Sequence, residues 1–249
     1  MMETKITSRK NPLIQQVRKL LSSKKEREQA GLFVADGTKL LHEAVRYYPG
    51  LETVLLTEAI QMELPEGVEV VRVSEEIMEY VSPMETPQGA LFLCRLPEQK
   101  PWKVCGGMLL LDGIQDPGNL GTILRTADAL DIPVALLEGC ADPYNHKTVR
   151  ASMGAVFRKQ PIQSTWEQAR DLCREAGVPI AVTALSPQAK DIREEKLSCL
   201  AVVIGSEGRG VRPEILEQAD RELIIPMNAH CESLNAAIAA AIVMWQMKN

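Results

Sequence analysis

From residue 108 onward, short apolar runs of strand length alternate with helical patterns, and this alternation restricts the fold more than any other feature. The expected strands are residues 108–111, 134–137, 180–183, 200–204 and 222–225. Strands that alternate with helices form a mostly parallel sheet covered by helices on both faces. Ligands bind such α/β sheets beyond the carboxyl ends of the strands, so a functional site is expected in the loops that follow them.

The sequence before residue 108 has a different pattern. Residues 1–30 are basic and have helical spacing, whereas residues 31–96 are typical of a small α/β domain. Its β-like runs are 32–34, 53–56 and 68–73, and its helical run is 40–47. The stretch 96–101 contains the proline and lysine typical of a linker. We therefore expect two domains, 1–96 and 101–249.

Charge is distributed unevenly along the chain. The 249 residues carry a net charge of −5, but residues 1–30 contain eight Lys or Arg against three Glu. A basic arm on an acidic body suggests contact with a polyanion, with Arg9 and Lys10 among the candidate residues. A solvated amphipathic helix remains the alternative, because the apolar residues of this arm fall at helical spacing; they are Leu13, Val17, Leu20 and Leu21.

Composition excludes several other classes of protein. Hydrophobic residues make up 45% and charged residues 24%, which is typical of a soluble globular chain. The longest mostly apolar run, 234–245, is too short to span a bilayer, and the N-terminus does not resemble a secretory signal, so we expect a cytoplasmic protein. The six cysteines are scattered without a C-x-x-C pair, and no metal site is expected.

The first of three polar loops follows the strand at 108–111. In the helix after it, Asn119 is a plausible N-cap, and Arg125 projects from the face opposite the apolar one. A guanidinium is a fixed cation suited to holding phosphate, although a solvated arginine is the alternative.

The second loop, 204–211, places three glycines among Ser206, Glu207 and Arg209. Glycines at a strand end let the backbone approach a ligand closely, although tight turns without a ligand are the alternative. The spacing is neither G-x-G-x-x-G nor a Walker loop, which argues against an NAD- or NTP-using enzyme. Pro213 then suits the first turn of a helix.

The third loop, 224–235, runs from a strand ending at Pro226 to an alanine-rich helix that begins at or near Ser233. Together the three loops resemble the three motifs of the SpoU (TrmH-like) family of RNA ribose methyltransferases. N-x-G-x-x-x-R-x-A matches residues 119–127, G-x-E-G-x-G matches 205–210, and I-P-M…S-L-N matches 225–235. The resemblance covers residues 108–247.

The resemblance implies an α/β SPOUT catalytic domain with a C-terminal trefoil knot, a rare exception to usual chain topology. It also implies a homodimer and S-adenosylmethionine as the methyl donor. The positions that match the family's cofactor contacts are Thr183, Gly205, Ile225 and Leu234.

Residues 31–96 resemble the L30e-like substrate-binding domain that many family members carry. Phe33 to Gly37 matches its F-x-x-E-G start, with Asp36 where Glu is usual, and Thr86 to Gly89 matches its T-P-Q-G end. This similarity and the basic arm favour 23S-type ribosomal RNA as the substrate. A tRNA 2′-O-methyltransferase and an inactive RNA-binding protein with the same fold are the alternatives.

The reaction that the resemblance implies is methyl transfer to a ribose 2′-hydroxyl. The family's proposed activator matches Arg125, and free guanidinium stays protonated, so we expect Arg125 to orient phosphate and lower the hydroxyl's effective pKa. The positions expected to place the substrate and brace the loops are Asn119, Glu207, Ser233 and Asn235. Lys147, Arg150 and Arg158 belong to a cluster of cations around a short helix-like stretch, where family members carry similar basic residues near the catalytic crevice. We expect them to contact RNA, with a solvated helix face as the alternative. The family often has glycine shortly after I-P-M, where this chain has Asn228-Ala229-His230.

Overall fold

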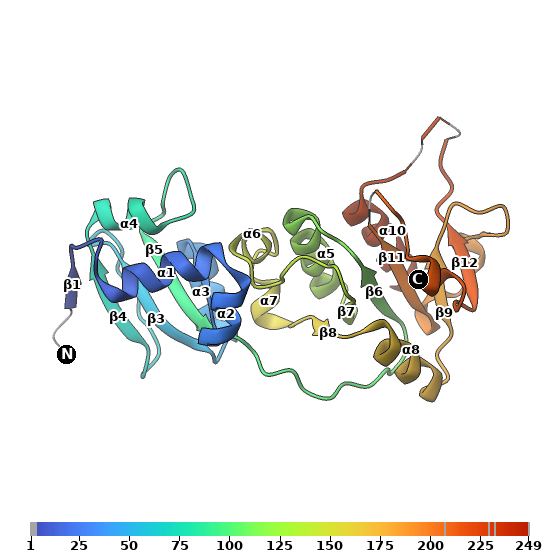
Figure 1. The fold of residues 1–249 in the computed structure, drawn as a ribbon, viewed down its shortest axis with the longest axis horizontal. Coiled ribbons are helices and arrows are strands. Elements are labelled where there is room, and N and C mark those ends of the chain that lie inside the picture. Colours follow the sequence, from blue (N-terminus) through green and yellow to red (C-terminus); the bar gives the residue numbers. More distant parts are fainter. Residues whose placement is uncertain (1–3, 207, 229, 232, 249) are drawn as a thin grey trace. The chain divides into compact units, whose positions relative to one another are not determined.

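The computed structural model describes residues 4–206, 208–228, 230–231 and 233–248 and divides into two compact units (Figure 1). The first unit comprises the residues up to Glu98 together with Tyr144–Arg158, and the second comprises Gln99–Pro143 and the residues from Lys159 onward. Residues 144–158 lie within the expected second domain in sequence, but their contacts group them with the first unit, because the rings of Tyr144 and Phe157 pack against Phe33.

The first unit is built on a five-stranded mixed sheet. Its strand order is β1-β4-β3-β5-β2, in which β1, β4 and β3 run parallel and β5 is antiparallel to both of its neighbours. The strands are β1 (Thr4–Ile6), β2 (Leu32–Asp36), β3 (Leu51–Leu56), β4 (Glu69–Val73) and β5 (Ala90–Arg95). The strands expected at 32–34, 53–56 and 68–73 are confirmed, whereas β1 and β5 were not predicted.

Six helices belong to the described part of the first unit. They are α1 (Pro12–Ser22), α2 (Lys24–Ala30), α3 (Thr38–Tyr47), α4 (Glu75–Val81), α6 (His146–Ala151) and α7 (Ala155–Arg158). The basic arm is two helices because Ser23 has extended backbone angles. Its hydroxyl accepts a hydrogen bond from the Glu26 N–H and so caps α2.

Two groups of side chains fill the first unit. Ile14 and Val17 of α1 and Ile77 of α4 pack with Val34 of β2 in one cluster. The neighbouring residue on β2, Phe33, belongs instead to an aromatic cluster with Tyr48, Phe92, Tyr144 and Phe157. Successive side chains of a strand point to opposite faces, so the sheet is covered on both sides.

The second unit is built on a seven-stranded sheet in which every pairing is parallel. Its order is β10-β12-β9-β11-β6-β7-β8. The strands are β6 (Met108–Asp112), β7 (Val134–Leu136), β8 (Ile162–Gln163), β9 (Ile180–Thr183), β10 (Lys190–Asp191), β11 (Ala201–Gly205) and β12 (Arg221–Ile224). The five predicted strands and the parallel α/β class are confirmed, and only the two-residue strands β8 and β10 were missed.

Helices cover the second sheet. They are α5 (Pro117–Ala129), α8 (Trp166–Glu175), α9 (Pro213–Leu216) and α10 (Ala236–Lys248), with short 3-10 turns at Ile192–Glu194 and Leu197–Cys199. Trp166 of α8 and Ile215 of α9 pack on Leu110 and Val203. On the other side, α10 contacts α5 and β11. No helix in the described part of the chain is long and apolar enough to cross a membrane.

Candidate functional site

The second unit contains a cavity of about 690 Å³ at the carboxyl ends of β9, β11 and β12. This is the edge at which an open α/β sheet binds ligands. The loop after β9 contributes Ala184, Leu185, Ser186 and Gln188, and the loop after β11 contributes Ser206 and Gly208–Val211. The loop after β12 and the start of α10 contribute Ile225, Met227, Ser233, Leu234, Ala236 and Ala239.

The four predicted cofactor positions all line this single cavity. Thr183 and Gly205 are the last residues of β9 and β11, while Ile225 and Leu234 lie in the loop between β12 and α10. Thr183 also donates a hydrogen bond from its hydroxyl to the Val203 carbonyl, at 3.1 Å, which fixes its side chain on the adjacent strand. Thr183 and Leu234, which are 51 positions apart in the sequence, line the same cavity because the parallel strands end at the same edge of the sheet.

The loop after β11 folds back on itself and forms one wall of the cavity. Ser206 and Gly210 exchange two backbone hydrogen bonds, of 3.1 and 2.9 Å. A Cβ added at Gly205 would lie 2.1–2.3 Å from backbone atoms of Gly210 and Val211, which is closer than real contacts allow. Gly205 is thus required by the loop's own fold, whereas a Cβ at Gly208 would meet open space.

The chemistry of the lining fits S-adenosylmethionine. A volume of about 690 Å³ lies within the range of roughly 300–1,000 Å³ that is usual for small-molecule sites. Most lining side chains are apolar, among them Leu185, Val211 and Leu216, and suit an adenine ring. Glu222 and Arg209 add one charge of each sign, which matches a ligand that carries both an ammonium and a carboxylate.

Two of the predicted substrate-positioning residues are hydrogen-bonded to each other. Asn235 donates from Nδ2 to Oδ1 of Asn119 at 3.0 Å. Asn119 is not the N-cap of α5, as we had predicted, because Asp116 takes that place and accepts from the Asn119 N–H at 2.7 Å. Helix α10 begins at Ala236, later than expected, since Asn235 Oδ1 accepts from the backbone N–H groups of Ala237 and Ile238.

Arg125 lies on the exposed side of α5, where this helix meets α10. Its guanidinium has no hydrogen bond or ion pair with another described residue, and it borders a second hollow of about 540 Å³. Ile238, Ile242 and Trp245 line the same hollow and are 53%, 37% and 62% exposed. Arg125 therefore lies on an apolar helix face rather than among the residues that line the larger cavity.

The remaining two predicted catalytic positions are Ser233 and Glu207. Ser233 lines the larger cavity beside Leu234. Glu207 lies outside the residues that the structure describes.

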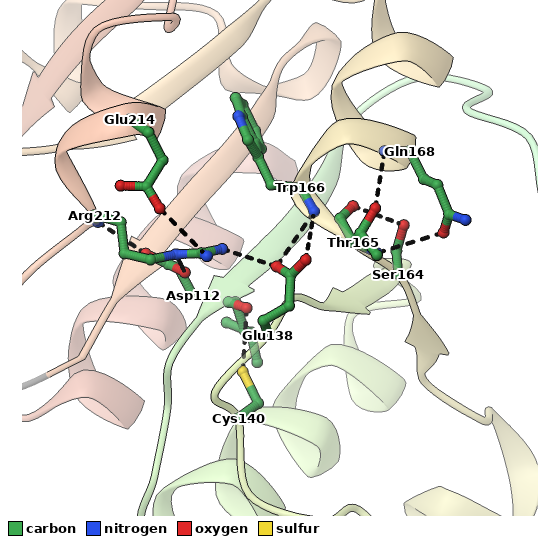
Figure 2. A network of polar contacts seen from close by, with 10 residues as sticks. Asp112, Glu138, Cys140, Ser164, Thr165, Trp166, Gln168, Arg212 and Glu214 are labelled. Carbon is green, nitrogen blue, oxygen red and sulfur yellow. Dashed lines mark hydrogen bonds and ion pairs between the residues drawn. The ribbon is translucent and has the colours of Figure 1, made fainter.

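An ion-pair network around the buried Asp112, which was not predicted from the sequence, lies beside the loop after β11 (Figure 2). Arg212 donates its backbone N–H to Oδ2 of Asp112 at 2.8 Å and its Nε–H to Oδ1 at 2.6 Å. Its Nη2 donates to Glu138 at 2.9 Å, and Glu138 also accepts from the Trp166 N–H. Burial raises the pKa of Glu138, but hydrogen bonds from its own N–H, from Arg212 and from Trp166 outweigh burial, so the pKa lies below its ordinary value.

The five cations predicted to contact RNA all lie in the first unit, and three of them have protein partners. Arg9 pairs with Glu76 at 2.8 Å and lies 4.7 Å above the ring of Tyr80. Arg158 pairs with Glu43, and Arg150 contacts the Met84 sulfur. Lys10 and Lys147 are exposed, and neither forms an ion pair with another described residue.

Within the described residues, no group of His, Cys, Asp and Glu side chains is arranged to hold a metal ion. All six cysteines are free thiols: Cys94 and Cys173 are buried, Cys140 is partly buried, and Cys105, Cys199 and Cys231 are exposed.

Comparison with known proteins adds independent information. Residues 107–245 match the model of the SpoU rRNA Methylase family, and residues 11–91 match that of the MRM3-like substrate binding domain. The chain is 34% identical over 247 residues to the 23S rRNA (guanosine(2553)-2′-O)-methyltransferase RlmP of Bacillus subtilis, covering 98% of each protein.

Solved structures of RNA methyltransferases superpose on nearly the whole chain. The AdoMet-bound rRNA methyltransferase from Sinorhizobium meliloti superposes with a TM-score of 0.87 at 29% identity, covering 98% of this chain and 97% of that one. An RNA 2′-O ribose methyltransferase superposes with a TM-score of 0.80 at 27% identity, covering 98% of each chain.

Proposed function

Because the chain belongs to the SpoU rRNA methylase family, we propose that it transfers a methyl group from S-adenosylmethionine to a ribose 2′-hydroxyl of 23S-type ribosomal RNA. The observation that carries this proposal is the single cavity lined by all four predicted cofactor positions. The full-length similarity to a 23S rRNA 2′-O-methyltransferase supports the choice of RNA.

The cofactor would be held by the loops at the carboxyl edge of the second sheet. S-adenosylmethionine supplies an electrophilic methyl group bonded to its positively charged sulfur. Thr183, Gly205, Ile225 and Leu234 bound the space for it, and the folded loop after β11 brings backbone close to the ligand. A preformed cavity would hold the bound cofactor in one orientation, which would lower the entropic part of the barrier to methyl transfer.

Arg125 is the proposed catalytic residue. Its exposed guanidinium, which no other described residue engages, orients the phosphate next to the target ribose. The positive charge lowers the effective pKa of the 2′-hydroxyl as that oxygen becomes a nucleophile, and the proton passes to a phosphate oxygen or to water. Arg125 itself stays protonated throughout.

Asn119, Ser233 and Asn235 position the substrate and brace the two loops on either side of the reaction. The bond between Asn119 and Asn235 ties the start of α5 to the start of α10, and α5 is the helix that carries Arg125. Glu207 has the same proposed role on the strength of the family motif alone.

The enzyme acts as a homodimer that pairs through the face formed by α5 and α10. Ile238, Ile242 and Trp245 leave an apolar surface exposed on one face of α10. Exposed apolar patches of this kind mark association sites. Because Arg125 borders the same surface, dimerisation would enclose the reacting end of the site.

The first unit binds RNA. Residues 11–91 match a substrate-binding domain, and the exposed Lys10 and Lys147 are free to contact phosphates. Arg9, Arg150 and Arg158 would have to exchange their protein partners for phosphate, so we expect smaller contributions from them. The proposed setting is the cytoplasm, and the trefoil knot remains a prediction that the family implies.

The proposed function is tested by methyl transfer from labelled S-adenosylmethionine to separated rRNA and tRNA from a strain that lacks the gene. Label recovered from 23S RNA as a 2′-O-methyl nucleoside supports the proposal. Label in tRNA alone assigns the tRNA reaction instead. No label in either RNA, together with measurable RNA binding, identifies an inactive RNA-binding protein or a requirement for an assembly intermediate.

A further inference from the structure

We propose that Arg212 is a positioning residue that holds the cofactor-binding loop, residues 205–211, by fastening its C-terminal end to the buried carboxylate of Asp112. This inference rests on the proposed function, because it concerns the wall of the cavity assigned to S-adenosylmethionine. Neither Arg212 nor Asp112 lines that cavity, so their influence would be exerted through the loop.

Arg212 binds Asp112 with both its main chain and its side chain. The backbone N–H reaches Oδ2 at 2.8 Å and the guanidinium reaches Oδ1 at 2.6 Å, so each carboxylate oxygen has its own donor. The Asp112 side chain is 1% exposed. A buried carboxylate without a partner is strongly unfavourable, and removing one member of such a pair costs far more than the pair contributes. The position of Arg212 is therefore tightly restricted.

Both ends of the loop are fixed against the same strand. Gly205, at the start of the loop, is the register partner of Asp112 across β11 and β6. Arg212, the residue after the loop, returns to that same aspartate. The backbone bridge between Ser206 and Gly210 closes the segment between these two anchors. The path of the loop is thus determined by one aspartate at its base.

A second carboxylate restrains the guanidinium from the other side, as Figure 2 shows. Glu138 accepts from Arg212 Nη2 at 2.9 Å and from the Trp166 N–H at the start of α8. Glu214 lies 3.4 Å from Nη1. Arg212 thereby joins the end of β6, the segment after β7 and the start of α8 to the exit of the loop. Lysine would keep the positive charge, but its single ammonium group cannot donate to Asp112 and Glu138 in the two fixed directions that the planar guanidinium provides.

This arrangement has a functional consequence because much of the cavity wall comes from the loop itself. Gly205, Ser206, Arg209 and Val211 all line the cavity. If the C-terminal anchor is lost, the loop must be ordered when the cofactor binds, and that ordering weakens binding. RNA binding, which we assign to the first unit, should not depend on the anchor. The expected signature is therefore selective: weaker cofactor binding with unchanged RNA affinity.

The test compares wild type with Arg212→Gln, Arg212→Lys and Asp112→Asn. We expect S-adenosylmethionine binding, measured by calorimetry, to weaken about tenfold or more in Arg212→Gln, the loss typical of a buried charged hydrogen bond. The cofactor affinity of Arg212→Lys should lie between those of wild type and Arg212→Gln. The double variant Arg212→Gln/Asp112→Asn should lose less affinity than the sum of the losses in the two single variants. RNA affinity should stay within twofold of wild type. Arg193→Gln is the matched control, because Arg193 pairs with Asp191 on the surface of the same unit.

Hydrogen exchange of the cofactor-free protein provides a readout that does not need activity. Peptides covering residues 205–212 should exchange faster in Arg212→Lys than in wild type, while peptides from the core of β11 should not change. If Arg212→Gln does not fold, Arg212→Lys carries both measurements. Equal cofactor affinity and equal loop exchange in wild type and Arg212→Lys would overturn the proposal. A wild-type protein that does not bind S-adenosylmethionine at all would overturn the proposed function instead.

Discussion

Asn235 bonds to Asn119 across two helix starts that lie 116 residues apart in the sequence, and the same asparagine caps α10. Its Nδ2 donates to the Asn119 oxygen while its Oδ1 accepts from the N–H groups of Ala237 and Ile238. One side chain thus fixes both the start of α10 and its distance from α5. Both polar ends of this amide are used, so the residue cannot be replaced without losing one contact.

Substitutions at these two positions should separate the bridge from the cap. Asn119→Ala removes the bridge but leaves the cap of α10 in place, and it should lower the free energy of unfolding by about 1 kcal/mol. Asn235→Ala removes the bridge and the cap and should cost about 1 kcal/mol more. Denaturant unfolding of the two variants measures both values. Equal losses would show that Asn235 contributes nothing as a cap.

Two glycines of the same loop offer a second, matched comparison. Gly205→Ala should abolish cofactor binding, because its Cβ would overlap backbone atoms of Gly210 and Val211. Gly208→Ala should leave binding near the wild-type value, since a Cβ there meets nothing within 4 Å. Calorimetric titration with S-adenosylmethionine measures both variants. Tight binding by Gly205→Ala would show that this loop is not folded as described.

The exposed face of α10 gives a prediction about assembly. Trp245→Glu combined with Ile238→Glu should yield a monomer, because burying unpaired carboxylates in an apolar interface costs more free energy than the contact provides. Trp245→Phe keeps an apolar ring and should keep the dimer. Sedimentation equilibrium distinguishes the two states, and methyl transfer should fall with the dimer. A wild-type protein that is monomeric at micromolar concentration contradicts the proposed assembly.

The six thiols should react in two groups. Burial raises the pKa of Cys140 and of Cys173 to about 11 and raises that of Cys94 further, so these thiols stay protonated and inert at pH 8. Iodoacetamide should therefore label Cys105, Cys199 and Cys231 in the native protein and the other three only after unfolding. Peptide mass spectrometry reads the pattern directly. Rapid native labelling of Cys173 would contradict its burial.

Much of the second unit followed from sequence because its strands are continuous apolar runs, and parallel strands bring their following loops to one edge. That geometry explains why Thr183, Gly205, Ile225 and Leu234 line one cavity. The strands β8 and β10 were missed because a strand of two residues is too short to show the alternation of apolar and polar residues. The break in the basic arm depends on the backbone of Ser23, which helical spacing does not reveal.

The contacts that sequence reasoning missed are long-range. Asp112 and Arg212 are 100 residues apart, and no local pattern links them. The aspartate at the end of an apolar strand was the available signal, since a carboxylate placed there needs a partner. The contacts of residues 144–158 were not predicted for a similar reason: local pattern does not show that Tyr144 and Phe157 pack against Phe33.

If Arg125 is the catalytic residue for methylation of a ribose in 23S RNA, its removal should slow the reaction without affecting the cofactor. Wild type, Arg125→Lys and Arg125→Ala should be compared on 23S RNA that lacks the modification, with the product identified by nucleoside mass spectrometry. We expect a 2′-O-methyl nucleoside with wild type and at least a hundredfold slower formation with Arg125→Ala, the loss typical of removing a major charge-stabilising group. Cofactor affinity should be unchanged in both variants. Undiminished methylation by Arg125→Ala, or a methyl group found on a base, would contradict this proposal.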